Sequence, residues 1–427
     1  MRIVHVSRSD LGGGAALAAY RLHTALRAAG EDSTMLVETK YSDDATVHEA
    51  SRSRRLAARM RRNLVTRRVR GDARRAVPEP SDLAPLFSDD RAAYGADLAA
   101  QIPSDAAVTL HWIARFVDLG GLIRALGAER RFVWRLADMN PFTGGCHYDE
   151  GCGRFRDSCG MCPLLRVPSA GDVSHQIWRR KQAALDLLSS GQLHVVAISR
   201  QWAELASASS LLRRFSFSVI PPAVDTDVFR PEDRAAARRE LGLEPEATVV
   251  MFAAHTLNKP VKGADLLAEA LRALPADLGA LTLLTVGHRT MPEIDARIDH
   301  VHLGSADDPR LAVTAYNCAD VAVLPSRQEA FGQVVIEAMA CGVPVVGFAT
   351  GGILDAVADG ETGFVAPEVT SGSLRTALVR ALSDRPALQA MRVSCRRVVE
   401  RRFAAGVVAG EYQALYRALA DGTAARG

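Results

Sequence analysis

Features that mark membrane-spanning, disulfide-stapled or disordered chains are scarce in this sequence. The 427 residues include only seven cysteines, and aromatic residues make up 6%. No run of about 18 uncharged apolar residues occurs, which excludes a membrane-spanning helix. Hydrophobic residues reach 48% and charged residues 24%, the balance of an ordinary globular protein, which excludes disorder as the main theme. This length predicts two or three domains, each able to bury its own core.

The N-terminus and the cysteine count together predict a cellular compartment. The first residues, Met1 to Ser7, enter a strand pattern at once and contain no apolar core of a signal peptide. An odd number of cysteines in such a chain indicates a reducing compartment. We therefore expect a soluble, cytoplasmic protein with a small net charge of +3.

Short β-rich runs alternate with longer helical stretches rich in Ala, Leu and Arg, which predicts parallel sheets covered on both faces. The proline-punctuated stretch 220–231 separates two such series of similar length. We predict an α/β fold with two doubly wound, Rossmann-like domains, 1–220 and 221–409, and a terminal segment 410–427 that contains a last helix. The expected strands are 3–6, 33–37, 108–111, 132–136 and 194–198 in the first series, and 249–253, 281–286, 300–303, 321–324, 344–346 and 363–365 in the second.

The segment 52–75 breaks the charge balance, because it contains eleven Arg and one acidic residue, Asp72. Leu56, Met60 and Leu64 recur at helical spacing on one face. One interpretation is a solvated helix whose thin apolar stripe packs on its own domain. Another is a basic amphipathic helix that lies on an anionic membrane surface. Binding to nucleic acid is the weakest interpretation, because no aromatic interleaving or helix-turn-helix pattern is present, and we expect no such partner.

The stretch 325–344 carries the most informative chemistry. It follows a predicted strand, so 326–330 should form a loop at the carboxyl end of that strand, where open α/β sheets bind ligands. A helix should then begin near Gly332, which lets a ligand approach the backbone closely. The free N–H groups of Gly332, Gln333 and Val334 would form an anion site at the helix start.

Two glutamates flank this predicted anion site. Glu329 lies just before the helix and Glu337 about one and a half turns into it. A diphosphate at the helix start would therefore have one carboxylate towards each end, able to accept hydrogen bonds from sugar hydroxyls. For either glutamate alone, the simpler interpretation is a charge favoured by the helix dipole or a solvated surface residue.

Taken together, this block resembles the E-x7-E motif of retaining GT-B glycosyltransferases of family 4. The resemblance covers nearly the whole chain. It implies that Glu337 binds the nucleotide ribose and that Glu329 holds hydroxyls of the transferred sugar. It also implies that Phe331, Gly332 and Gln333 contact the sugar and the diphosphate.

The segment 258–263, Asn-Lys-Pro-Val-Lys-Gly, resembles the basic donor-phosphate element of the same family. This implies that Lys262 neutralises charge on the diphosphate leaving group. The family usually carries an Arg several residues earlier, where this chain has His255 or Thr256, and Lys259 is our candidate for the second positive charge. We expect no catalytic metal, because lysine and helix N–H groups can carry that electrostatic load.

The loop Leu11-Gly-Gly-Gly-Ala-Ala16 follows the first predicted strand and precedes a helix. Its spacing is not G-x-G-x-x-G, so a dinucleotide fingerprint is not supported. The loop resembles the Gly-Gly loop of family 4, whose backbone approaches the donor, and we assign Gly13 and Gly14 to substrate binding.

Many family 4 enzymes have His-Asp after a later strand of the first domain. This chain has Ala137-Asp138, so Asp138 matches the acidic member and the histidine is missing. We name Asp138 as a catalytic candidate. His111 and His147 are nearby in sequence, and either could be structural.

Four cysteines follow in the spacing C-x5-C-x6-C-x2-C: Cys146, Cys152, Cys159 and Cys162. Four thiolates so close in sequence can form a tetrahedral structural zinc site, with His147 as a substitute ligand. Disulfides or a redox-active C-x-x-C are a second interpretation, and free thiols are a third. The segment 143–148, Thr-Gly-Gly-Cys-His-Tyr, resembles a subset of family 4 with the same cluster, which implies a place near the acceptor site.

The resemblance implies a GT-B fold in which 221–409 holds the nucleotide, 1–220 faces the acceptor and the last helix crosses back to the first domain. The implied activity is that of a retaining hexosyltransferase, which moves a sugar from a UDP- or GDP-linked donor to a glycan or lipid-linked acceptor. A surface-polysaccharide pathway, at the inner face of the cell membrane, fits this activity. The alternatives are a catalytically silent GT-B protein that binds a nucleotide sugar or scaffolds a complex, and a zinc-stabilised, Arg-rich module that binds nucleic acid or membrane.

Overall fold

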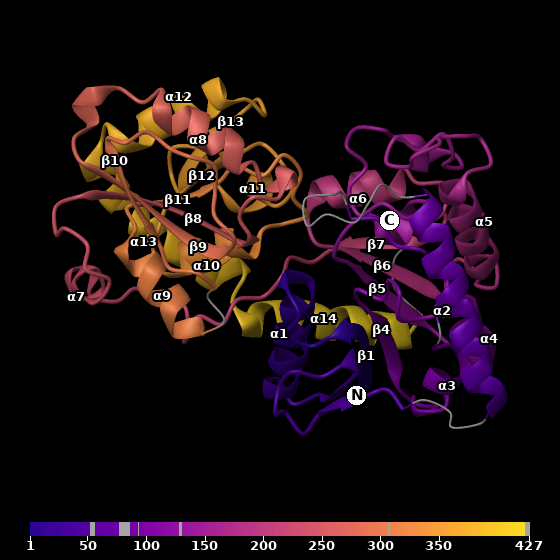
Figure 1. Ribbon diagram of the computed structural model, residues 1–427. Coiled ribbons are helices and arrows are strands. Elements are labelled where there is room, and N and C mark those ends of the chain that lie inside the picture. The colour runs from indigo at the N-terminus through magenta and orange to yellow at the C-terminus, as the bar shows by residue number, and fades with distance from the viewer. Residues whose placement is uncertain (52–55, 77–85, 93, 128–129, 306–307, 423–427) are drawn as a thin grey trace. The chain divides into compact units, whose positions relative to one another are not determined.

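The computed structural model describes the chain except for residues 52–55, 77–85, 93, 128–129, 306–307 and 423–427 (Figure 1). The chain divides into two compact units. The N-terminal unit comprises Met1–Ile220 and Ala409–Gly427, and the C-terminal unit comprises Pro221–Val408. Each unit contains one parallel sheet with helices packed against it (Figure 1).

The N-terminal unit contains a seven-stranded sheet in which every pair of neighbouring strands is parallel. The chain order reverses between β1 and β4, which are neighbours although β2 and β3 lie between them in sequence. Ligands of open α/β sheets bind outside the carboxyl ends of the strands at such a switch point. In sheet order the strands are β3 (Val47–Glu49), β2 (Asp32–Thr39), β1 (Arg2–Ser9), β4 (Ala107–Leu110), β5 (Phe132–Leu136), β6 (Leu193–Ala197) and β7 (Ser216–Val219).

The helices of this unit connect its strands, and the last helix of the chain joins them. From residue 409 onward that helix groups with the N-terminal unit. The hydroxyls of Tyr416 and Thr109 lie 2.6 Å apart, and Gln413 donates to Glu31 at 2.8 Å. The helices are α1 (Gly14–Ala28), α2 (Leu56–Ala76), α3 (Ala96–Ala99), α4 (Leu119–Leu126), α5 (Val173–Leu185), α6 (Arg200–Ser207) and α14 (Ala405–Ala420).

The C-terminal unit contains a six-stranded sheet, again with parallel neighbours throughout. Its switch point lies between β8 and β11. The strands are, in sheet order, β10 (Ile298–His302), β9 (Leu281–His288), β8 (Thr248–Thr256), β11 (Val321–Leu324), β12 (Val345–Phe348) and β13 (Gly363–Ala366). The helices are α7 (Arg234–Glu240), α8 (Ala264–Arg272), α9 (Pro309–Cys318), α10 (Gln333–Ala340), α11 (Ile353–Ala356), α12 (Ser371–Leu382) and α13 (Arg385–Arg402).

Strand sequences explain why both sheets are covered on both faces. All four residues of β11, Val-Ala-Val-Leu, are buried, and so are all four of β12, Val-Val-Gly-Phe. Such continuous apolar runs are typical of parallel sheets, because alternate side chains point into two apolar layers. In the C-terminal unit one core cluster joins α8 and α12 to these strands through Phe252, Leu267 and Leu378.

Four buried histidines make the stability of the N-terminal unit sensitive to acid. Burial lowers the pKa of His5 and His111 well below the ordinary value of 6.5 and lowers that of His23 and His194 to about 4. These groups take up protons near pH 6.5 in the unfolded chain and only at lower pH in the folded unit. Stability is therefore lost as pH falls through that window, by up to about 1.4 kcal/mol per pH unit for each histidine.

Tryptophan fluorescence can test this prediction, because all four tryptophans of the chain, Trp112, Trp134, Trp178 and Trp202, lie in the N-terminal unit. We expect the urea midpoint to fall steeply from about pH 7 to about pH 5. His194 hydrogen-bonds to two serine hydroxyls at 2.8 Å, so His194→Asn keeps polar contacts without a titrating group. The stability of that variant should depend less steeply on pH, because unfolding should take up about one proton fewer. An unchanged dependence would show that His194 does not contribute.

Candidate functional site

The two sequence-predicted loops of the C-terminal unit meet at its switch point. One loop follows β8 and contains Lys259 and Lys262, and the other follows β11 and contains Glu329. The backbone N–H of Arg327 donates to the carbonyl of Val261 at 2.9 Å, so the two loops are joined directly. The sheet topology therefore brings together residues that are 67 positions apart in the sequence.

Lys262 and Glu329 form an ion pair at this junction. The distance between Lys262 Nζ and Glu329 Oε2 is 2.6 Å, and Ser326 Oγ donates to the same oxygen at 3.2 Å. The Glu329 side chain is 9% exposed, whereas Lys262 retains 25% exposure. A largely buried carboxylate thus lies beside an ammonium group that a ligand can still reach.

A second ion pair supports the same junction from the surface. Arg327 holds Asp265 in α8 through two contacts, Nη1 to Oδ1 at 2.8 Å and Nη2 to Oδ2 at 2.5 Å. The Arg327 guanidinium lowers the pKa of the Asp265 carboxyl below its usual range. Arg327 Nη1 also donates to the carbonyl of Pro260 at 2.6 Å, which fixes the position of the lysine loop relative to the glutamate loop.

The glutamate loop leads into α10, as expected from the sequence. Gly332 is the residue before the helix and has φ +86°, a conformation that favours glycine. A Cβ at Gly332 would also lie 2.8 Å from a methyl carbon of Leu324. No side chain caps the helix start and no acidic residue occupies its first turn, so the positive end of the helix dipole lies near Gly332.

Glu337 and Phe331 lie deeper than the sequence suggested. Glu337 is 8% exposed, and Tyr316 donates to its Oε2 at 2.9 Å. Phe331 is 2% exposed and packs edge-on against Phe403, with ring centroids 5.6 Å apart. The Phe331 ring therefore supports the loop from beneath, and contact with a sugar would involve its backbone.

In the N-terminal unit the glycine loop lies at the carboxyl end of β1. Gly13 has φ +94° and precedes α1, so this position favours glycine, and a Cβ at Gly13 or Gly14 would meet open space. Asp10, which sequence analysis missed, is fully buried and holds the loop. Its carboxylate accepts backbone hydrogen bonds at 2.9 Å from Leu11, Tyr41 and Ser42.

The structure places a histidine beside Asp138. His147 Nδ1 lies 2.5 Å from Asp138 Oδ2, and Trp112 Nε1 donates to the same oxygen at 2.6 Å. Asp138 Oδ1 accepts the backbone N–H of Asn140 at 2.9 Å, and His147 Nε2 lies 2.9 Å from Ser88 Oγ. The histidine missing at position 137 thus has a spatial counterpart nine residues from Asp138, and the Thr-Gly-Gly-Cys-His-Tyr segment was the available signal for it.

These contacts bear on the role expected for Asp138. Its side chain is 9% exposed, and both of its oxygens already accept hydrogen bonds. It connects the segment after β4, through Trp112, to the segment after β5. This arrangement favours a positioning role for Asp138 over direct contact with a substrate.

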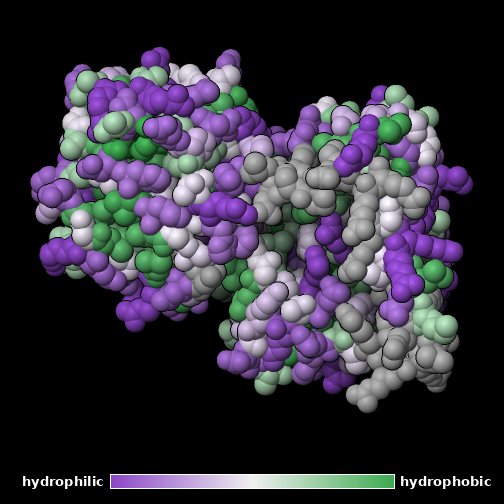
Figure 2. Space-filling model, viewed as in Figure 1, coloured by the Kyte–Doolittle hydropathy of each residue, from purple (hydrophilic) through white to green (hydrophobic). Residues whose placement is uncertain are grey.

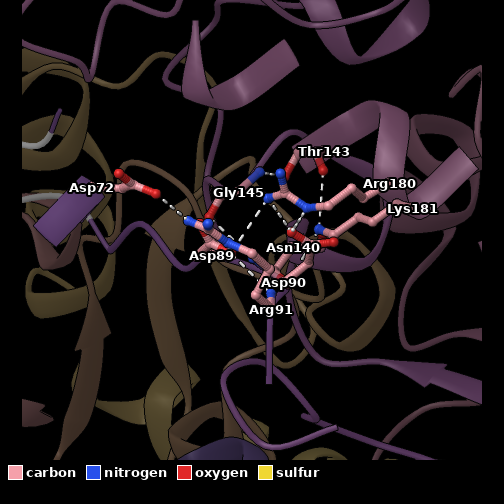
Figure 3. Close-up of polar contacts among 9 residues, drawn as sticks. All are labelled: Asp72, Asp89, Asp90, Arg91, Asn140, Thr143, Gly145, Arg180 and Lys181. Atoms are coloured by element: carbon pink, nitrogen blue, oxygen red, sulfur yellow. Dashed lines mark hydrogen bonds and ion pairs between the residues drawn. The ribbon is translucent and has the colours of Figure 1, made fainter. Parts of the chain in front are cut away.

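A buried lysine holds the backbone of the loop 138–147 (Figure 3). Lys181 Nζ, from α5, donates to the carbonyls of Asn140 and Thr143, the latter at 3.0 Å. Asn140 Nδ2 in turn donates to the carbonyl of Gly145 at 3.0 Å. Burial lowers the pKa of Lys181. The ammonium group thus ties two turns of this loop to one helix.

Beside Lys181, a network of Arg–Asp ion pairs joins α5 to the segment 89–91 (Figure 3). Arg180 Nη2 lies 2.6 Å from Asp90 Oδ1, and Arg91 Nη2 lies 2.7 Å from Asp89 Oδ2 and 2.8 Å from Asp72 Oδ2. Asp72 belongs to α2, so this ion-pair network also anchors the C-terminal part of that helix.

The Arg-rich segment contains the predicted helix, α2, whose preceding residues 52–55 lie outside the described part of the chain. Two of its apolar side chains are largely exposed: Met60 at 65% and Leu64 at 50%. Neither α2 nor any other described helix is long and apolar enough to span a bilayer. Hydrophilic and apolar residues are mixed on the visible face of each unit (Figure 2), and Met60 and Leu64 are two of several large apolar side chains that are exposed in the described part of the chain.

Part of the chain is similar to known sequences. Residues 247–384 match the family described as glycosyl transferases group 1. A D-inositol 3-phosphate glycosyltransferase of Geodermatophilus obscurus is 38% identical over 218 residues, which are 46% of this chain and 48% of that protein. One of Segniliparus rotundus is 40% identical over 160 residues, 34% of each chain. The chain therefore spans less than half the length of these curated relatives.

Solved structures match nearly the whole chain. Sucrose-phosphate synthase from Thermosynechococcus elongatus superposes with a TM-score of 0.63 at 19% identity, covering 99% of this chain and 100% of that one. The chain has the GT-B fold. Anabaena HepE, solved in complex with UDP and glucose, gives a TM-score of 0.62 at 16% identity over 98% of this chain and 100% of its own. The prediction of two doubly wound domains is confirmed.

Proposed function

We propose that this protein is a retaining glycosyltransferase, of the family 4 type, that uses a nucleotide diphospho-sugar. The observation that carries the proposal is the Lys262–Glu329 ion pair at the switch point of the C-terminal unit. It lies within the segment 247–384, which matches the glycosyl transferases group 1 family. An ammonium group, a carboxylate and the backbone at the start of α10 there form a site suited to a diphosphate and a sugar.

Each group has a distinct part in the proposed reaction. The N–H groups around Gly332 and Gln333 bind the diphosphate, and Lys262, assisted by Lys259, stabilises the charge that develops on it as it leaves. Glu329 holds hydroxyls of the transferred sugar, and Glu337 contacts the nucleotide ribose. The bond from the anomeric carbon to the diphosphate breaks while the acceptor oxygen bonds to that carbon on the same face. The acceptor proton passes to the departing phosphate oxygen, so no side chain need act as nucleophile.

The donor and acceptor are assigned by chemical class. A UDP-sugar is the first candidate, because HepE was solved with UDP-glucose, and a GDP-sugar is the second. The acceptor supplies a hydroxyl on a glycan or lipid-linked glycan, in a pathway of surface polysaccharide synthesis. The names of the curated relatives add a phosphorylated cyclitol as a specific alternative acceptor.

A transfer assay tests the proposal. The protein is incubated with UDP-glucose, UDP-N-acetylglucosamine or GDP-mannose and with D-inositol 3-phosphate or a lipid-linked glycan, and products are analysed by mass spectrometry and NMR. We expect one donor to be consumed and its anomeric configuration to be retained. An inverted product would overturn the retaining mechanism. Nucleotide binding without any turnover would instead favour a silent GT-B protein.

We assign the N-terminal unit to the acceptor, and Gly13 and Gly14 to substrate binding. Asp138 and His147 hold the segment after β5 against Trp112 and thereby shape this part of the N-terminal unit. The four cysteines lie in the same unit, close in sequence to this segment. This assignment makes Asp138 a positioning residue.

We further propose that α2 binds an anionic membrane, which would bring the enzyme to lipid-linked acceptors at the cytoplasmic face. The exposed apolar side chains of Met60 and Leu64, on a helix rich in arginine, support this proposal. Met60→Glu/Leu64→Glu should abolish sedimentation with vesicles that contain phosphatidylglycerol, whereas Val393→Glu, an equally exposed apolar site on α13, should not. Equal sedimentation of both variants would contradict the assignment.

A further inference from the structure

Four cysteines of the N-terminal unit line one small cavity. The cavity measures about 20 Å³, which is room for a single atom or water molecule. Its wall also includes Gly144, Asp149 and Ser174. The cysteines are Cys146, Cys152, Cys159 and Cys162, and all four are free thiols.

The four side chains reach the cavity from separate turns of the backbone. Cys146 forms an isolated antiparallel bridge with Phe87, and the backbone N–H of Cys152 donates to the carbonyl of Asp149 at 2.8 Å. Cys159 and Cys162 lie at the two ends of a tight turn. The fold therefore brings thiols from three separate turns to one cavity.

The turn between the last two cysteines has an unusual backbone. Cys159, Gly160 and Met161 have φ values of +50°, +98° and +48°. Left-handed backbone costs roughly 1–2 kcal/mol for a residue other than glycine. The turn is held by hydrogen bonds from Gly160 to Ser174 Oγ at 2.9 Å and from the Met161 N–H to a backbone carbonyl at 2.7 Å. Backbone strain that surrounding hydrogen bonds maintain is typical of functional positions.

The sulfur atoms also have polar neighbours suited to thiolates. The backbone N–H of Gly144 donates to Cys159 Sγ at 3.1 Å, and a Cβ at Gly144 would lie 2.9 Å from Cys159 Cβ. The buried ammonium of Lys181 interacts electrostatically with Cys146 and Cys159. N–H groups and a cation beside sulfur offset the negative charge of a metal bound by four thiolates.

Burial favours the neutral forms of Cys146 and Cys159 unless a cation binds them. It raises the pKa of Cys159 to about 11 and raises the pKa of Cys146 further. A bound divalent cation reverses this preference, because a coordinating thiol gives up its proton. The cavity, the strained turn and the N–H to sulfur contact favour a metal site over a set of inert thiols.

We infer that Cys146, Cys152, Cys159 and Cys162 bind one zinc ion as a closed, tetrahedral, structural site. In the described part of the chain, no three His, Cys, Asp or Glu side chains already lie close enough together to ligate a metal. Binding therefore requires the sulfurs to turn inward toward the cavity that they line. The ion would connect the segment 152–162 to Cys146 and so to the loop that carries Asp138 and His147.

Metal analysis of the purified full chain tests the inference without reference to transfer activity. Mass spectrometry of the metal should give one zinc per chain, and thiol titration of the unfolded protein with chelator should give seven free thiols. Cobalt added in place of zinc should show the intense visible bands of a tetrahedral thiolate site. Cys152→Ser should lower the zinc content severalfold, whereas Cys318→Ser, a buried cysteine of the C-terminal unit, should keep it.

Three results would overturn the inference. Seven free thiols with no metal would show inert cysteines, and fewer than seven would show disulfides. Iron with the absorption of an iron–sulfur cluster would show a different cofactor. Cys152→Ser could fail to fold, so the wild-type protein also supplies a test: a thiol-blocking reagent should release one zinc as four thiols react.

Discussion

Replacing Glu329 with Gln is expected to lower kcat by about 10²- to 10³-fold while changing the Kd for the nucleotide little. The substitution preserves shape but removes the negative charge that lies 2.6 Å from Lys262 Nζ. On our account this carboxylate holds the transferred sugar against the diphosphate, and its interaction matters most in the transition state. Initial rates with the donor identified by the transfer assay, together with calorimetric titration of the nucleotide, measure the two quantities separately.

Two companion variants make this prediction specific. Asp265→Asn removes a carboxylate from the adjacent α8, and we expect only a small loss of kcat because its side chain is half exposed and pairs with Arg327. Glu337→Gln should weaken nucleotide binding and leave kcat nearly unchanged at saturating donor. If Glu329→Gln turned over donor at the wild-type rate, the assignment of this switch point as the reaction site would be wrong.

Gly263→Ala is expected to destabilise the C-terminal unit by about 4 kcal/mol. Gly263 has φ +70°, and a Cβ there would lie 1.8 Å from the carbonyl oxygen of Pro325. The methyl group must therefore separate the lysine loop from the glutamate loop. Because Lys262 precedes this glycine directly, activity should fall together with stability.

Gly242→Ala is the matched control for this change. Gly242 has nearly the same φ, +66°, but a Cβ there would meet open space. Gly242→Ala should lower the free energy of unfolding only by the cost of a left-handed backbone at alanine, roughly 1–2 kcal/mol, and should leave activity intact. Urea unfolding followed by circular dichroism compares the two variants. Equal losses in the free energy of unfolding would show that the contact with Pro325 does not add to the cost of Gly263→Ala.

The fold was predictable because its signal is repeated along the chain. Each βα unit contains a buried apolar run followed by a helical stretch. This alternation predicts parallel sheets even where one strand or helix is predicted wrongly. Short edge strands carried less signal. The segment Val47–Glu49 has only three residues, and Ser216–Val219 has no fully buried residue, so neither showed an apolar run.

The residues of the candidate site could be named from the sequence where one local motif contains them. Glu329 and Glu337 lie in one such motif, and Lys262 lies in a recognisable loop. The pairing of Lys262 with Glu329 depends on β8 and β11 being neighbours, which is a property of the sheet and not of either motif. His147 was not identified as the partner of Asp138 because the eight loop residues between them show no periodicity that would indicate how the loop folds back.

Binding of nucleoside diphosphates tests the central claim most directly. A thermal-shift panel of the diphosphates UDP, GDP, ADP and dTDP, together with the monophosphate CMP, is measured on the wild-type protein and on Lys262→Ala. Ligand at about 100 times its Kd adds about 2.7 kcal/mol to the free energy of unfolding, a clear rise in melting temperature. The account predicts that one nucleoside diphosphate raises the melting temperature of the wild type and has a much smaller effect on Lys262→Ala. No response to any nucleotide at millimolar concentration, or an equal response in both proteins, would contradict it.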